Sequence, residues 1–171
     1  MESSAKAAGH PIHQQLIVFP LGLLATSVIF DVVGLISGGS TWPMVAYWTM
    51  LAGIVGALVA APFGLIDFLA IPHGTRARRI GAMHGMGNGV VSLLFLGSWL
   101  LRSPQEFPTT AALALSFGGA ALALLTAWLG GELVSRLAVG VSEGAGLNAS
   151  NSMHSDARHA DQHRPVRYAG R

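Results

Sequence analysis

Hydrophobic positions form four long runs that are separated by short connections. A bilayer core about 30 Å thick requires about 20 apolar residues in a helix that rises about 1.5 Å per residue. The runs meet this length and cover about residues 16–36, 45–69, 80–101 and 110–133. Gly, Pro and Ser occupy the connections, as is typical of turns. The pattern predicts an all-α polytopic membrane protein, an antiparallel up-down bundle of four transmembrane helices.

The rest of the chain is polar. Residues 1–14 form an N-terminal segment, residues 15–141 the four-helix domain, and residues 142–171 a tail. The tail lacks apolar periodicity, and we expect it to be disordered on its own. The first run is longer than the apolar stretch of a cleaved signal peptide, so a membrane span is favoured over that alternative. No internal repeat is evident in the sequence.

Composition agrees with a membrane location. Hydrophobic residues make up 51% and charged residues 11% of the chain, whereas a soluble domain carries about 25% charged residues. The lack of cysteine excludes a disulfide framework, a thiolate metal site, an iron–sulfur cluster and a catalytic thiol. A net charge of +2 is too small to indicate nucleic acid. The expected partner is the lipid bilayer.

Positive charge is distributed unequally between the two sides of the predicted bundle. Both termini and the middle loop share one side, which holds nine of the ten Lys and Arg residues. Arg102 is the one on the other side. The positive-inside rule therefore predicts a multi-pass protein of the inner (plasma) membrane with both termini in the cytoplasm.

Small residues recur at four-residue intervals within the spans. Gly81, Gly85 and Gly89 form such a stripe in the third span. Membrane helices associate by close packing through small residues. Packing within the bundle is the favoured interpretation, and a homo-oligomer that associates through these glycines is the alternative. In the second span, Pro62 predicts a kink because it removes one helical hydrogen bond.

Polar side chains collect at one level of the predicted bundle. An ionisable group near the middle of a bilayer costs at least about 2.5 kcal/mol, so it needs an end position or an inward partner. Antiparallel folding brings together the cytoplasmic helix ends, which carry His10, His13, Asp67, His73, His84, Asn88 and Glu132. Asp31 lies toward the other end, in the helical phase of the inward stripe.

Imidazole and carboxylate groups are ligands for transition metals, and a pair of histidines can also hold haem iron. The candidate cofactor-binding residues are His10, His13, His84 and Asn88. The candidate metal ligands are His10, His13, His84, Asp67 and Glu132. The alternative is structural, since interfacial histidines also cap helices and carboxylates pair with nearby arginines. That alternative is slightly favoured for His10, His13 and His84 and more strongly for His73. Adventitious binding is favoured for His154, His159 and His163 in the tail.

A series of short motifs runs in order along residues 9–141. They read GHPIH at 9–13, FPLGL at 19–23, GLID at 64–67, IPHGTRAR at 71–78 and WLGGEL at 128–133. Together with His84 and Asn88, these segments resemble the bacterial four-span membrane proteins classed as domain of unknown function 2231. The resemblance implies the architecture rather than an activity. Because some relatives are joined to Rieske-type or haem-carrying domains, it also implies membrane electron transfer.

The chain departs from that family pattern at several positions. Relatives often carry a further histidine just before the Phe-Pro pair, where this chain has Val18, and a Pro where it has Gln14. Near the last span, relatives often place Tyr and His where Ser135 and Leu137 stand. Two imidazoles of the family pattern are therefore absent, which weakens a multi-histidine metal centre and leaves His10, His13 and His84.

Three functions are consistent with the sequence. The favoured one is a non-catalytic subunit or assembly protein of a larger membrane complex. The second is membrane electron transfer through a b-type haem or a transition metal held by His10 or His13 together with His84. The third is transport of protons or small solutes, with Asp31 as a relay. No phosphate-binding loop or nucleophile–base pair is evident, so an enzyme is not expected.

Overall fold

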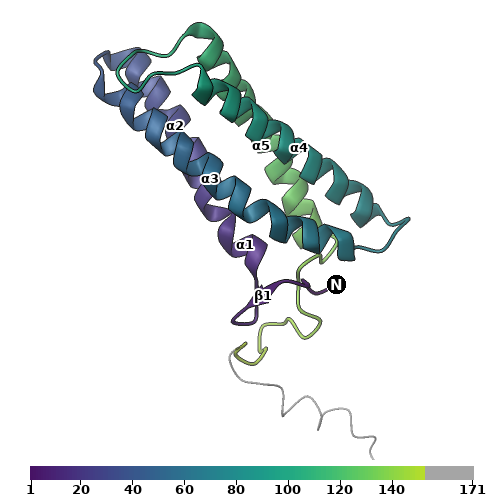
Figure 1. The fold of residues 1–171 in the computed structure, drawn as a ribbon. Coiled ribbons are helices and arrows are strands. Elements are labelled where there is room, and N and C mark those ends of the chain that lie inside the picture. The colour runs from purple at the N-terminus through teal and green to yellow at the C-terminus, as the bar shows by residue number, and fades with distance from the viewer. Residues whose placement is uncertain (153–171) are drawn as a thin grey trace, which may run out of the picture.

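A computed structural model describes residues 1–152, and the tail histidines lie outside the described residues. Its long helices, shown in Figure 1, are α2 (Val18–Ser37), α3 (Thr41–Ala70), α4 (Arg76–Leu100) and α5 (Thr110–Ser135). The chain before them forms β1 (Lys6–Ala7), β2 (His10–Pro11) and the short helix α1 (Ile12–Leu16). The two strands pair antiparallel. The hydrophobic pattern predicted neither this small hairpin nor a separate helix at α1.

Within residues 1–152, four helical segments are long and apolar enough to cross a membrane, with α1 and α2 counted as one segment. The predicted all-α four-span architecture is confirmed. Helices α3 and α4 each begin four residues before the corresponding hydrophobic run, and the other ends lie within two residues of the predicted limits. Thr75 and Thr109 cap α4 and α5 by accepting from the N–H groups of Arg78 and Ala112. Helix α3 continues through Pro62 as a single helix.

The bundle consists of two helical hairpins (Figure 1). Helix α2 packs closely along α3, and α4 along α5, whereas contacts between the hairpins are fewer and run through α3–α4 and α2–α5. The connections 38–40 and 101–109 lie at one end of the bundle, which we call the ion-pair end. The N-terminal segment and the turn 71–75 lie at the other, which we call the histidine end.

Glycine allows close approach inside each hairpin. A Cβ atom on Gly53 would lie 2.7 Å from Cγ of Leu24, and one on Gly119 would lie 3.0 Å from Cε2 of Phe95. These contacts flank the hydrophobic core, whose buried members are Leu24, Met50, Ile54, Val91 and Phe95. Residues larger than glycine would separate the helices at both crossings.

The predicted glycine stripe of α4 serves packing within the chain at only one of its three positions. A Cβ atom on Gly81 would meet Phe68 at 3.1 Å, so this glycine lies against the preceding helix. At Gly85 and Gly89 no atom lies within 4 Å of such a Cβ. The homo-oligomer alternative for this stripe stays a prediction.

Gly53→Ala is expected to destabilise the protein by about 1–3 kcal/mol, because the new methyl group overlaps Leu24 in a packed core. Gly22→Ala is the matched control in α2, since nothing lies within 4 Å of its Cβ position. Alanine at that position should be neutral or stabilising, given its helix propensity. Thermal unfolding in detergent micelles measures both, and equal unfolding temperatures would contradict the packing described.

The histidine end is covered by the two segments that flank the bundle. The Ser3 hydroxyl and the Ser4 N–H donate to Oδ1 of Asp67, at 2.7 Å and 3.1 Å. The N–H of Glu143 donates to Glu2 at 3.1 Å. Hydrogen bonds from Lys6 and Glu143 lower the pKa of the Glu2 carboxyl. Residues 142–152, which were predicted as part of a disordered tail, thus form turns that reach the N-terminal segment.

Candidate functional site

His13 is anchored against helix α3. Its Nδ1 lies 3.1 Å from the carbonyl oxygen of Ala60. A Cβ atom on Gly64 would lie 2.7 Å from Cε1 of the ring, so only glycine leaves room for the imidazole. Because a carbonyl only accepts, Nδ1 carries the proton. In the neutral ring Nε2 is then the free, basic nitrogen.

His84 is anchored against helix α5 in the same way. Its Nδ1 lies 2.8 Å from the carbonyl oxygen of Thr126, and a Cβ atom on Gly130 would lie 3.0 Å from Cε1 of the ring. In both anchors the accepting carbonyl belongs to the residue four positions before the glycine. The structure therefore holds two of the predicted site histidines in the same kind of anchor, and each anchor selects the same tautomer.

Asn88 fixes the surroundings of His84. Its Oδ1 accepts from the Thr126 hydroxyl at 3.0 Å, and its Nδ2 donates to the His84 carbonyl at 2.9 Å. The same Nδ2 lies 3.2 Å from Nε2 of the imidazole. One turn of α4 thus carries both the histidine and the amide that positions it, as the sequence spacing predicted.

The other predicted site residues have partners of their own. His10 is exposed in the terminal hairpin, where its Nδ1 contacts the Ala8 carbonyl at 3.0 Å. Asp67 accepts from the serines of the N-terminal segment, and Glu132 accepts from Arg76 at 2.7 Å. Within residues 1–152, no group of three or more His, Asp or Glu side chains gathers closely enough to hold a metal ion.

The α4 surface beside His84 is not covered by protein. Gly85 follows the histidine, and its Cβ position has no atom within 4 Å. Ala61, one residue after the Ala60 whose carbonyl anchors His13, is also exposed although it lies in the middle of α3. Small, exposed residues therefore directly follow His84 and Ala60 along their helices.

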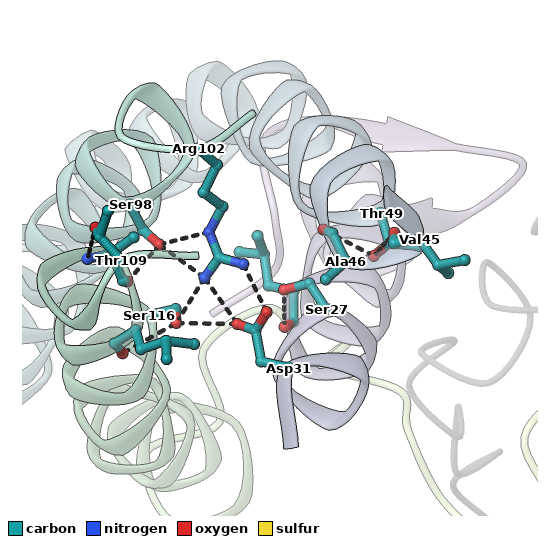
Figure 2. A network of polar contacts seen from close by, with 12 residues as sticks. Ser27, Asp31, Val45, Ala46, Thr49, Ser98, Arg102, Thr109 and Ser116 are labelled. Carbon is teal, nitrogen blue, oxygen red and sulfur yellow. Dashed lines mark hydrogen bonds and ion pairs between the residues drawn. The ribbon is translucent and has the colours of Figure 1, made fainter. Parts of the chain in front are cut away.

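A buried ion pair joins the hairpins at the other end (Figure 2). Nη1 and Nη2 of Arg102 donate to the two Asp31 oxygens at 2.6 Å and 2.7 Å. The side chains of Arg102 and Asp31 are 1% and 0% exposed. Ser98 accepts from Nε of Arg102 at 3.1 Å, and Ser116 bridges Nη2 and the Asp31 carboxylate.

This ion pair was not predicted from the sequence. Arg102 was expected as the one cation on the outer side, and Asp31 as a candidate relay whose inward partner was not identified. The sequence does contain one indication of this site. A serine lies one helical turn before each charged residue, Ser98 before Arg102 and Ser27 before Asp31, and the structure buries both serines fully. What was missing was the folding that places α2 opposite the end of α4.

The protein is a four-helix membrane bundle, and two anchored histidines lie at one of its ends. A family described as "Predicted membrane protein (DUF2231)" matches residues 9–143, and the chain belongs to this family. The resemblance seen in the sequence is thereby confirmed. No curated protein and no solved structure matches the chain. Function must therefore be argued from the site itself.

Proposed function

We propose that the protein binds a b-type haem at the histidine end, with His13 and His84 as the two axial ligands, and that it serves membrane electron transfer. The observation that carries this proposal is the matching pair of anchors, in which each Nδ1 faces a backbone carbonyl. Ligating histidines almost always donate their other ring N–H to such an acceptor, which fixes the tautomer and the ring orientation.

The surroundings of the two histidines also fit such a group. Facing helices of a four-helix bundle are a common scaffold for cofactor sites. Gly64 and Gly130 let the imidazoles lie close to α3 and α5. A haem on His84 would take the place of the Asn88 amide, whose Nδ2 lies 3.2 Å from Nε2 in this structure. When bound, a haem would supply a one-electron redox centre, held by two neutral imidazoles in an apolar setting.

A haem is favoured over a metal ion with mixed ligands. The Asp67 and Glu132 carboxylates are engaged by serines and by Arg76. Two imidazoles complete the coordination of haem iron, whereas zinc sites use three or four protein ligands. His13 is also favoured over His10, since His10 lies in the exposed terminal hairpin. With both termini in the cytoplasm, as the charge distribution predicts, the haem would lie on the cytoplasmic side.

The absorption spectrum of the full chain, purified in mild detergent from cells supplied with haem precursor, tests this proposal. We expect a Soret band, a sharp α band after reduction, and about one haem per chain in a pyridine haemochrome assay. A preparation with no Soret band, which also fails to bind added haemin, would contradict it.

A second candidate is a non-catalytic subunit or assembly protein of a larger membrane complex. A shallow apolar groove on the outside of α4 and α5 favours it, and Met83, Met86, Leu122, Leu125, Trp128 and Leu129 line this groove. Co-purification from native membranes distinguishes the two candidates. A persistent large partner without pigment supports the second, and a pigmented protein without a partner supports the first.

A further inference from the structure

The two hairpins make the same contacts at corresponding places. In the first hairpin, His13 lies on Gly64 and Leu24 lies on Gly53. In the second, His84 lies on Gly130 and Phe95 lies on Gly119. Each pair of contacts has the imidazole toward the histidine end and the apolar side chain near the core. The two hairpins are therefore similar in their side-chain contacts as well as in the path of their helices.

The spacing along the chain is constant in both sets. Positions on α1 and α2 recur 71 residues later on or just after α4, namely His13 and His84, Leu24 and Phe95, Ser27 and Ser98, and Asp31 and Arg102. Positions on α3 recur 66 residues later on α5, namely Ala46 and Ala112, Met50 and Ser116, Gly53 and Gly119, Ala60 and Thr126, and Gly64 and Gly130. Apart from the four residues around the histidine anchors (His13, His84, Gly64 and Gly130), every residue in these lists has a buried side chain or backbone position.

We infer that the chain is an internal repeat of two equivalent halves, α1–α3 and α4–α5, related by an approximate twofold rotation about the long axis of the bundle. Such a rotation would exchange the α3–α4 and α2–α5 interfaces, of which the α3–α4 interface is the more extensive. Each half then contributes one equivalent imidazole. The ligand part of this inference rests on the proposed function, because equivalent imidazoles suit a group with two opposite axial positions.

The repeat corrects the expectation from the sequence, in which no internal repeat was evident. The identical residues are few, and most are Gly, Ala or Ser, which are common throughout this chain. The two intervals also differ, 71 against 66 residues, so no single alignment offset reveals both sets. Contacts between side chains identify the equivalent positions, because they do not depend on the lengths of the connections.

The halves differ where they meet at the ion-pair end. Asp31 and Arg102 occupy corresponding positions and carry opposite charges, and Figure 2 shows their side chains pointing toward each other. Like charges at these positions would repel in a dry interface. The opposite pair holds two unlike halves together in one chain. Arg102 follows the end of α4, and its long side chain reaches back to the level of Ser98.

Exchange of the core residues tests the repeat without any cofactor. Leu24→Phe and Phe95→Leu are each expected to lower the unfolding temperature in detergent. The double exchange should recover more than half of the summed loss, because both halves offer a glycine beneath the side chain and both residues belong to one core cluster. A double variant that loses the full sum would overturn the inference.

The matched control combines Leu24→Phe with Val91→Ala. Val91 belongs to the same cluster but does not correspond to Leu24 in the repeat. We expect this pair to lose about the sum of its single changes. If this pair recovers as much stability as the exchange does, any loss of side-chain volume in the cluster compensates for Leu24→Phe. This result would also overturn the inference.

The haem-loaded protein provides a second test that separates this inference from the proposed function. His13→Ala and His84→Ala should give the same spectrum, and added imidazole should restore both to the same extent. Different spectra would overturn the equivalence of the halves while leaving haem binding intact. Failure of the wild-type chain to bind haem would contradict the proposed function, and the core exchange would still decide the repeat.

Discussion

Replacing either His13 or His84 by alanine is expected to abolish the low-spin spectrum of a haem with two histidine ligands. Each variant removes one of the two imidazoles whose Nδ1 is anchored to a carbonyl. The remaining imidazole leaves the iron with one axial ligand from the protein. The reduced-minus-oxidised spectrum of the purified variants measures this loss, together with their haem content.

The histidines outside the pair provide the controls for this prediction. His10→Ala and His73→Ala should keep the wild-type spectrum, because both residues are exposed outside the long helices. Loss of the low-spin spectrum in His10→Ala but not in His13→Ala would assign the ligand to the terminal hairpin instead. An unchanged spectrum in His84→Ala would contradict the site altogether.

Breaking the ion pair between Asp31 and Arg102 is expected to give the largest loss of stability. Asp31→Asn or Arg102→Gln should lower the free energy of unfolding by about 3–5 kcal/mol, because the remaining partner is left as an uncompensated buried charge. Both side chains are almost fully buried, and Nη1 and Nη2 of Arg102 each donate to one Asp31 oxygen. Denaturant unfolding in mixed micelles, followed by circular dichroism, measures the effect.

The ion pair at the histidine end is the matched control. Arg76 donates to Glu132 at a similar distance, but the Arg76 side chain is 52% exposed. An exposed pair contributes about 0–1 kcal/mol, so Arg76→Gln should change the unfolding free energy little. Equal losses at the two pairs would contradict the dry, enclosed character of the Asp31 site.

The sequence predicted much of the histidine end. His84 and Asn88 are one helical turn apart, and this spacing was enough to place them on one face of the third span. The sequence left open whether His10 or His13 was the candidate ligand on the first span. The structure favours His13, since helix α1 begins at Ile12 and the chain before it turns back as a strand pair. Proline favours the first positions of a helix, so Pro11 indicated a helix start close to the observed one.

The partners of these residues are not predictable from local sequence. The carbonyls of Ala60 and Thr126 are ordinary backbone groups, and 47 and 42 residues separate them from the imidazoles that they anchor. Asp31 and Arg102 are 71 residues apart. Such contacts depend on the rotation and crossing of whole helices, which the packing of small residues decides.

The sequence by itself determined the number, order and approximate limits of the membrane spans and the end of the bundle at which histidines gather. Those features follow from hydropathy and length, because every span must satisfy its backbone hydrogen bonds internally. The tertiary structure alone decided which groups meet: the two anchored imidazoles, the enclosed Asp31–Arg102 pair and the equivalence of the two hairpins. In an apolar bilayer, hydropathy does not distinguish the faces of a span, so close contacts at glycines and buried polar pairs decide how the spans associate.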